Sequence, residues 1–283
     1  MMRDLLVFGR RGQVARELAR LAPEARFLGR DQADLSDPQA CADAIGGAGA
    51  VINAAAYTAV DRAEAEPQLA HRINAEAPAA MARACRMHGI PFLHVSSDYV
   101  FSGEGSAPHP EDDPTGPLNV YGASKLAGER AVLNQGGQAA ILRTSWVFSG
   151  HGRNFLTTML NLGASRDRLS IVDDQIGGPT PAADIAAALL RMVRMMQDDP
   201  AKAGIFHLSG APDVSWAGFA ASIFEQAGLA CRVDPIPTAD YPTPAKRPLN
   251  SRLDCSRIRR QFGIERPDWH QAIGRILNSE RQT

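Results

Sequence analysis

Tyr121 and Lys125 stand four residues apart in the segment NVYGASKLAGE. On a helix this spacing places the phenol and the ammonium on one face, one turn apart. Upstream, Ser96 and Ser97 end a short apolar run. Reduction of a ketone by hydride needs an acid beside the oxygen, because negative charge develops there as the hydride arrives. The three residue types together indicate a ketone-reducing site.

Each of the three side chains has an expected role. A free tyrosine has a pKa of about 10 and is a slow proton donor near neutral pH. We expect the ammonium of Lys125 to stabilise the phenolate of Tyr121 and to lower this pKa. We expect Ser97, in preference to Ser96, to hold the substrate carbonyl by a hydrogen bond. The Tyr/Lys pair alone is weak support, since such a pair also arises by chance on a solvated helix face.

The N-terminal segment has the pattern of a dinucleotide-binding turn. An apolar run at 3–8 leads into GRRGQVA and then into an amphipathic stretch, which predicts strand, glycine turn and helix. The first glycine permits the tight turn, the second lets backbone amides approach a pyrophosphate, and Ala15 supplies the third small residue. Phosphates are expected at the N-terminus of this helix. The predicted contacts are Gly9, Gly12, Gln13 and Val14.

A second apolar run, at 25–28, ends at Gly29-Arg30-Asp31. At this position a carboxylate suits the free 2′-hydroxyl of NADH and an arginine suits the 2′-phosphate of NADPH. Arg30 is nearer the strand and guanidinium suits phosphate, so NADPH is favoured, with NADH as the alternative. Two ordinary surface charges are the other interpretation. Further cofactor contacts are predicted at Asp34 and Leu35 on the adenine side and, after a third run at 50–53, at Ala56, Tyr57 and Thr58.

Composition excludes several classes of function. The chain has 283 residues, is 45% hydrophobic and carries a formal charge of −1. It has no basic cluster of the kind that binds nucleic acid, and no apolar stretch near the ~20 residues of a membrane span. Its four cysteines are widely spaced and its seven histidines lack ligand spacing. These features predict reduced thiols in the cytoplasm and no catalytic metal.

Short apolar runs alternate with helical patterns, which predicts an α/β fold with a doubly wound parallel sheet of the Rossmann type. A dinucleotide-binding domain is expected at 1–145 and a smaller α/β substrate lobe at 146–283. Residues 181–210 have the alternative of returning to the first domain. The predicted strands are 3–8, 26–28, 50–54, 91–96, 139–144, 169–172 and 205–208. The predicted helices are 13–21, 38–45, 68–88, 121–134, 154–164, 181–196, 214–228 and 268–279.

Longer motifs stand along most of the chain. They are Gly9-x-x-Gly12-Gln13, Asn53-Ala-Ala-Ala-x-Thr58-Ala-Val-Asp61-x-Ala-Glu64, Ser96-Ser97-Asp98-Tyr99-Val100-Phe101, Asn119-Val-Tyr121-Gly-x-x-Lys125, Arg143-Thr-Ser-Trp146-Val-Phe, Asp174-Gln175-x-Gly177-x-Pro179-Thr180, Tyr241-Pro-Thr-Pro and Arg247-Pro-x-Asn250-Ser251-x-Leu253. In order and spacing these motifs resemble the dTDP-4-dehydrorhamnose reductase family. Ser97 stands where the family usually has threonine, and this change keeps the hydroxyl.

The resemblance implies reduction of dTDP-4-dehydro-6-deoxy-L-mannose, a nucleotide sugar, to dTDP-L-rhamnose with NADPH or NADH. It implies a catalytic triad of Ser97, Tyr121 and Lys125. It also implies sugar contacts by Asp98 and Trp146, for which a turn cap and a core side chain are the alternatives. Substrate contacts are also expected at Gln175 and at Arg247, whose guanidinium suits the phosphates.

Two other functions stay open. The first is a nucleotide-sugar 4,6-dehydratase or 4-epimerase of the same fold, and the second is a non-catalytic regulatory subunit. The sequence leaves the oligomeric state open as well, with a homodimer as one alternative.

Overall fold

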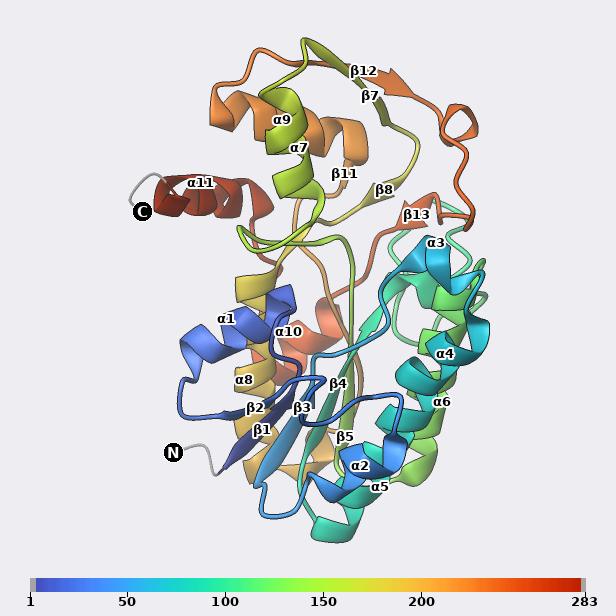
Figure 1. The fold of residues 1–283 in the computed structure, drawn as a ribbon, viewed down its shortest axis with the longest axis vertical. Coiled ribbons are helices and arrows are strands. Elements are labelled where there is room, and N and C mark those ends of the chain that lie inside the picture. Colours follow the sequence, from blue (N-terminus) through green and yellow to red (C-terminus); the bar gives the residue numbers. More distant parts are fainter. Residues whose placement is uncertain (1–3, 281–283) are drawn as a thin grey trace.

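The computed structural model describes residues 4–280, and at its centre is a six-stranded parallel sheet (Figure 1). The strand order is β10-β5-β4-β3-β1-β2. This arrangement confirms the predicted doubly wound α/β class. The strands are β1 (Leu5–Phe8), β2 (Arg26–Leu28), β3 (Ala50–Asn53), β4 (Phe92–Ser97), β5 (Ala139–Thr144) and β10 (Gly204–Leu208).

Helices cover both faces of this sheet, because alternate residues of its strands are apolar on both sides. On β1, Leu5 and Val7 join one buried cluster, whereas Leu6 and Phe8 join another. Figure 1 shows the two helical layers on opposite sides of the sheet. One layer holds α1 (Gln13–Leu21), α8 (Ala182–Asp198) and α10 (Ser256–Phe262). The other holds α2 (Pro38–Asp43), α4 (Pro67–His71), α5 (Ala77–His88) and α6 (Val120–Gln135), with α3 (Val60–Ala63) near its upper end.

A smaller lobe lies beyond the carboxyl ends of the strands and has its own apolar core. Its strands are short and pair over long sequence separations, as β12 with β7 and β13 with β8. The helices are α7 (Phe155–Gly163), α9 (Trp216–Ala227) and α11 (Trp269–Glu280). The strands are β6 (Val147–Phe148), β7 (Arg168–Val172), β8 (Ile176–Gly177), β9 (Thr180–Pro181), β11 (Val214–Ser215), β12 (Arg232–Ile236) and β13 (Asn250–Ser251).

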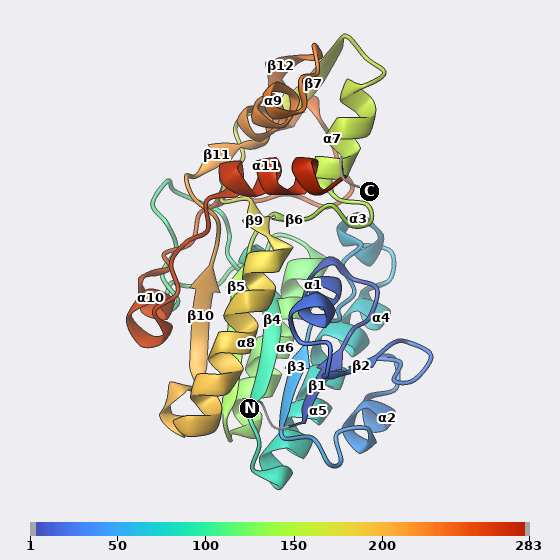
Figure 2. The same ribbon diagram turned by 90° about the vertical axis from the view of Figure 1, so that its left-hand side faces the viewer.

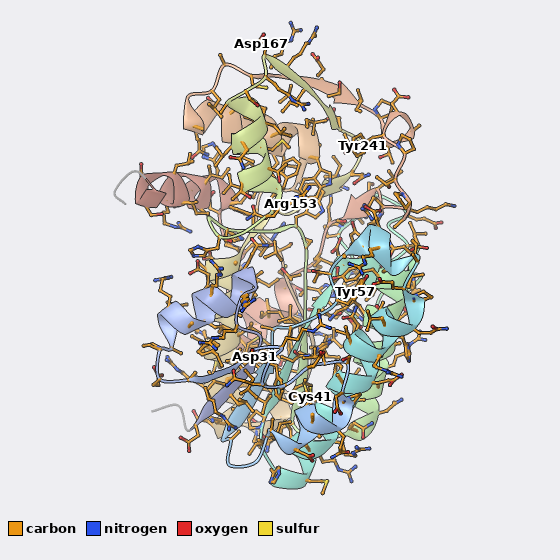
Figure 3. The ribbon with its side chains drawn as sticks, viewed as in Figure 1. Asp31, Cys41, Tyr57, Arg153, Asp167 and Tyr241 are labelled. Atoms are coloured by element: carbon orange, nitrogen blue, oxygen red, sulfur yellow. The ribbon has the colours of Figure 1, made fainter. Side chains whose placement is uncertain are left out.

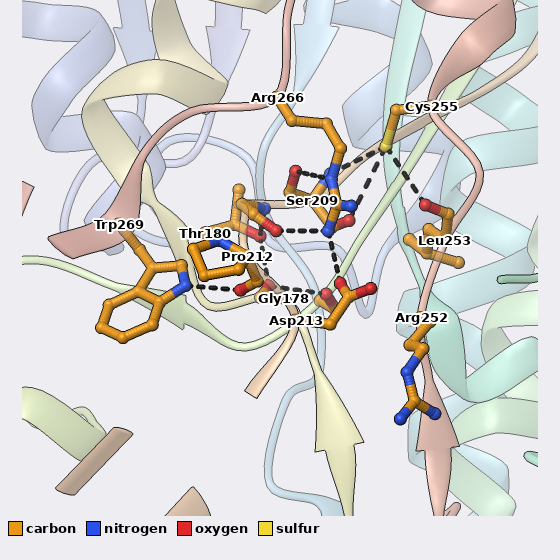
Figure 4. Close-up of polar contacts among 12 residues, drawn as sticks. Gly178, Thr180, Ser209, Pro212, Asp213, Arg252, Leu253, Cys255, Arg266 and Trp269 are labelled. Carbon is orange, nitrogen blue, oxygen red and sulfur yellow. Dashed lines mark hydrogen bonds and ion pairs between the residues drawn. The ribbon is translucent and has the colours of Figure 1, made fainter. Parts of the chain in front are cut away.

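The chain passes between the lobes more than once. After β9 it enters α8, which packs against α1, and then β10, which pairs with β5 at the edge of the large sheet (Figure 2). The sheet lobe is therefore built from residues on both sides of residue 145. Beyond β10, Arg266 bonds the carbonyl of Ser209 at 3.2 Å and pairs with Asp213, and Trp269 Nε1 donates to the carbonyl of Pro212 at 2.6 Å (Figure 4).

The helix predicted at 68–88 is interrupted by a π-helical turn, η1 (Arg72–Glu76). At its centre the buried side chain of Asn74 bonds the backbone of Tyr57 twice and the hydroxyl of Ser124. We attribute the interruption to these contacts, which join three segments through one amide. Across residues 4–280, no helix combines the length and the apolar character needed to cross a membrane.

Candidate active site

A cleft of about 1070 Å³ opens at the carboxyl ends of β1, β2 and β3. Figure 3 marks Asp31 and Tyr57, two residues that line it after β2 and after β3. Eight of the residues predicted to bind cofactor border this cleft, which brings together segments from three strand ends. They are Gly9, Gly12, Arg30, Asp34, Leu35, Ala56, Tyr57 and Thr58.

Backbone shapes the cleft at the first turn. Gly9 has a φ of +116°, which side-chain-bearing residues rarely adopt, and a Cβ there would lie 3.4 Å from both Ala15 and Ala54. Gly12 caps α1 without a side-chain hydrogen bond to the first turn of the helix. The first N–H groups of α1 are thus left for another acceptor, and this cradle fits a dinucleotide pyrophosphate.

The side chains of Gln13 and Val14 are engaged within the protein, and the backbone contacts predicted at these two residues stay predictions. The Gln13 amide accepts from the Ser149 hydroxyl at 2.8 Å and donates to the carbonyl of Val147 at 3.4 Å. Val14 is part of the apolar core. Neither residue borders the cleft. The glycine motif could not distinguish these contacts, because the first turn of a helix points side chains in several directions.

Arg30 and Asp34 form an ion pair at the rim, with 2.9 Å between Nε and Oδ2. The backbone N–H of Ser36 also donates to Asp34 at 2.9 Å, and this bond, followed by the bond from Arg30, lowers the pKa of the carboxyl. Most of the Arg30 side chain is exposed. The guanidinium is therefore held by a carboxylate and still faces solvent beside the cleft.

The sheet and α6 bring Ser97 and Tyr121 together. Ser97 ends β4, and its hydroxyl contacts the Tyr121 phenol and donates to Asp98 Oδ1 at 2.9 Å. Tyr121 lies in the first turn of α6, with its ring edge-on to Tyr99. Gly122 permits this approach, because a Cβ there would lie 2.2 Å from the Tyr99 carbonyl oxygen.

Lys125 lies one turn further along α6 and is fully buried. Its Nζ donates to the carbonyl of Val95 at 2.7 Å and lies 3.2 Å from His94 Nε2. Burial lowers the pKa of Lys125 to about 8, against a smaller opposing effect of Glu129.

The expected lowering of the Tyr121 pKa was wrong for this structure. Burial raises the pKa of Tyr121 to about 12, although the nearby Ser97 hydroxyl acts in the other direction. The sequence argument allowed for the charge of Lys125 and left out the loss of water around the phenol.

Asp98 follows Ser97 in the short helix η2 (Asp98–Val100) and is buried. Its Oδ2 lacks a partner among the described residues, whereas Oδ1 accepts from Ser97. Burial raises the pKa of this carboxyl to about 6, while the neighbouring hydroxyls of Ser251 and Ser97 oppose the rise. A buried carboxylate oxygen without a partner is costly unless a ligand meets it.

Trp146 and Gln175 meet in the smaller lobe through Trp216. The two indoles stack with ring centroids 3.5 Å apart and planes 9° apart. Trp216 Nε1 donates to Gln175 Oε1 at 3.2 Å, and Gln175 Nε2 donates to Thr238 at 3.1 Å. Trp146 has a φ of +47°, an uncommon conformation for a tryptophan. Its ring lies against Gly177, where a Cβ would come within 2.9 Å of the indole.

Arg247 bridges the lobes. Its Nη2 pairs with Asp61 Oδ2 at 2.8 Å, and Nη1 is buried without a partner in the part of the chain that the structure describes. Asp61 therefore bonds only one side of the guanidinium group. The free edge can therefore receive a second anion.

Sequence reasoning assigned no role to His94, Asn53, Trp216 or Asp61, although Asn53 and Asp61 belong to a motif quoted above. His94 is a polar residue inside the apolar run FLHV, and a buried imidazole needs hydrogen-bond partners. This signal could have marked it as part of the site. Within residues 4–280, no cluster of three or more His, Cys, Asp or Glu side chains has an arrangement that could hold a metal ion.

Comparison with known proteins decides the family. The protein-family model described as the RmlD substrate binding domain matches residues 2–282. A dTDP-4-dehydrorhamnose reductase of Sinorhizobium fredii is 44% identical over 284 residues, which cover 96% of each chain. This chain belongs to the dTDP-4-dehydrorhamnose reductase family. The resemblance carried by its motifs is thereby confirmed.

Further members of the dTDP-4-dehydrorhamnose reductase family agree in sequence and in structure. The reductase of Burkholderia thailandensis is 45% identical, with 95% of this chain and 96% of that protein covered. The crystal structure of the Bacillus anthracis reductase in complex with NADP superimposes with a TM-score of 0.91 at 32% identity, covering 99% and 100% of the two chains. The likeness therefore extends over both lobes.

Proposed function

We propose that this protein reduces the C4 keto group of dTDP-4-dehydro-6-deoxy-L-mannose with NADPH and forms dTDP-L-rhamnose. The observation that carries the proposal is the contact of Ser97 with the Tyr121 phenol, at the sheet edge where the cofactor cleft opens. Family membership supports the substrate, since the curated relatives are named for this reaction. The NADP complex of the Bacillus anthracis reductase supports the cofactor.

The cofactor is held by backbone on one side and by charge on the other. The turn at Gly9 and Gly12 would receive the pyrophosphate, residues 54–59 would hold the rest of the dinucleotide, and Arg30 would bind the 2′-phosphate. When bound, the reduced nicotinamide supplies the hydride. In binding NADPH, Arg30 would exchange part of its pairing with Asp34 for the phosphate, which favours NADPH over NADH without excluding the latter.

Tyr121 supplies the proton to the substrate oxygen, and Ser97 orients the carbonyl. The Ser97 hydroxyl has one hydrogen, which goes to Asp98 Oδ1 in this structure. Rotation of this hydroxyl toward the substrate oxygen would turn the same hydrogen onto the carbonyl. Lys125 acts on Tyr121 and on the nicotinamide ribose from the interior side of α6. The high pKa of Tyr121 keeps its proton in place until charge develops on the substrate.

Both lobes supply substrate contacts. Asp98 Oδ2 and Arg247 Nη1 are buried polar atoms without partners in residues 4–280, and they suit a sugar hydroxyl and a phosphate, respectively. Trp146 and Gln175 complete this wall. We also place the protein in the cytoplasm, since Cys41, Cys85, Cys231 and Cys255 are buried free thiols.

The deciding experiment follows nicotinamide absorbance after dTDP-4-dehydro-6-deoxy-L-mannose is added to the protein with NADPH or with NADH. We expect net consumption of NADPH in step with formation of dTDP-L-rhamnose, and slower consumption of NADH. A 4,6-dehydratase or a 4-epimerase would regenerate its cofactor and show no net consumption. A regulatory subunit would show no turnover, and either result would contradict the proposal.

A further inference from the structure

Three buried polar side chains form a line behind the candidate catalytic tyrosine. They are Asn53 at the end of β3, His94 in β4 and Lys125 in α6, and none has more than 1% of its surface exposed. Asn53 Nδ2 lies 3.1 Å from His94 Nδ1, and His94 Nε2 lies 3.2 Å from Lys125 Nζ. With so little water, each donor in this line needs a matching acceptor.

The direction of the hydrogen bonds is set at Asn53. The backbone N–H of Ala55 donates to the side chain of Asn53 at 3.1 Å. A backbone N–H can only donate, so the atom that receives it is the amide oxygen, and the amide nitrogen must face His94. His94 Nδ1 therefore accepts. A neutral imidazole that accepts at Nδ1 has its proton on Nε2.

This tautomer presents an N–H to Lys125. The amine already donates to the carbonyl of Val95 at 2.7 Å. An uncharged amine can donate there and accept from His94 with its lone pair, whereas an ammonium has three donors and no lone pair. If Lys125 were protonated, its ammonium and the Nε2–H of His94 would both be donors, only 3.2 Å apart.

We propose that Asn53 and His94 control the proton on Lys125: Asn53 holds His94 as the Nε2–H tautomer, and this N–H favours the uncharged amine. His94 is then a positioning residue for the reaction. Uptake of a proton by Lys125 requires His94 to carry its own proton on Nδ1 instead, with one net proton taken from solvent. It also requires the Asn53 amide to turn over, which breaks the bond from Ala55. Since Ala55 borders the cofactor cleft, the proton on Lys125 and the backbone beside the cofactor share one network.

The other described groups around Lys125 do not supply the acceptor that a protonated Lys125 would need in place of His94. Glu129, one turn further along α6, raises the pKa of the amine but is bound by Arg143 of β5 at 2.7 Å. From η1, Asn74 is uncharged and bonds Ser124. On the side of Tyr121, the charged group is Asp98 of η2, which bonds Ser97. Burial lowers the pKa of both His94 and Lys125, as expected for a neutral pair.

The chain is well suited to a direct test, because it has only three lysines, Lys125, Lys202 and Lys246. Carbon-13 NMR of protein labelled at lysine Cε follows each amine separately, with assignment by Lys202→Arg and Lys246→Arg. In His94→Gln the amide oxygen can reach the position of Nε2 and accept from an ammonium. We expect the titration midpoint of Lys125 to move up by about one pH unit or more, as a hydrogen bond to a charged group predicts.

Two controls accompany this shift. The signals of Lys202 and Lys246 should stay the same in wild type and in His94→Gln. The variant His109→Gln removes another buried histidine, whose side-chain partners are Asp113 and Asn250, and it should leave the Lys125 midpoint in place. An unchanged midpoint in His94→Gln, or an equal shift in His109→Gln, would overturn the inference.

The wild-type protein gives an independent measurement that needs no variant to fold. Two-bond proton–nitrogen spectra of nitrogen-15-labelled histidine report which ring nitrogen carries the proton. Above the titration midpoint of Lys125, we expect His94 to be protonated on Nε2 alone, and a proton on Nδ1 there would contradict the proposal. The importance of this proton for catalysis rests on the role proposed for Lys125. Neither NMR measurement depends on turnover, so both test the inference even if that role is wrong. Failure of Lys125→Ala to reduce activity would sink only that role.

Discussion

The two walls of the site are built in different ways. The cofactor wall consists of turns that follow β1, β2 and β3, and much of its surface is backbone beside glycine and alanine. The substrate wall is made of side chains from distant segments, and it contains Asp98 Oδ2 and Arg247 Nη1, which lack partners in the described chain. None of the residues with such orphaned atoms borders the cofactor cleft. Among the described residues, the first wall leaves no buried side-chain polar atom without a partner, whereas the second leaves two for its ligand.

The largest effect that distinguishes the cofactor wall from the substrate wall is expected at Gly9. In Gly9→Val the residue must adopt a φ of +116° with a branched side chain. We expect NADPH binding to weaken by about a hundredfold, the equivalent of ~3 kcal/mol of strain or displacement. Fluorescence titration measures the dissociation constant. Gly46→Ala is the control, because Gly46 has no positive φ and its nearest atom lies at 3.9 Å. Equal affinities of the two variants would show that backbone does not shape the cofactor wall.

The next effect concerns the pH dependence of folding. Because burial raises the pKa of Asp98 from 3.8 to about 6, the folded state holds this proton more tightly than the unfolded chain does. Stability is then full below pH 3.8 and is lost as pH rises through about 6. Relative to Asp98→Asn, the free energy of unfolding of the wild type should fall by about 3 kcal/mol across this window.

Denaturant titrations at several pH values measure this difference. Asp234→Asn is a control of opposite sign, since Arg168 lowers the pKa of Asp234 and favours folding as pH rises. A constant difference between wild type and Asp98→Asn would mean that Asp98 is not strained by burial.

The smallest effect is expected at the indole stack. Trp216→Leu keeps an apolar side chain, although a smaller one, and removes the partner of Trp146 and the donor to Gln175. We expect KM for the nucleotide sugar to rise about tenfold, which corresponds to the 0.5–1.5 kcal/mol of an aromatic pair plus a hydrogen bond. Steady-state kinetics and NADPH titration together make the test. A loss of NADPH affinity in this variant would contradict the division into a cofactor wall and a substrate wall.

The cofactor wall and much of the sheet lobe could be predicted from sequence, because their signals are local. The run at 139–144 and the helix at 13–21 coincide with β5 and α1. The smaller lobe was harder, since two-residue strands such as β8 and β13 pair across more than 70 residues and have no local period.

The residue types of the site could be predicted from the sequence, whereas the surroundings of each side chain were harder to predict. The residue types of Ser97, Tyr121 and Lys125 carried the chemistry, and the structure brings Ser97 to Tyr121. Spacing could not foresee that Lys125 would face His94, because the register between β4 and α6 is set by tertiary packing. Gly122 and Gly128 allow that packing through close approach to Tyr99 and Asn74. The same burial reversed the expected change in the pKa of Tyr121.

The most direct test of the central claim compares cofactor binding with turnover in Tyr121→Phe. The variant keeps the ring and loses only the hydroxyl that contacts Ser97. We predict a dissociation constant for NADPH equal to that of the wild type and a kcat lower by a factor of about 10²–10⁴, the usual contribution of a positioned acid. Turnover near the wild-type rate would contradict the account, because the proton would then reach the substrate from another group.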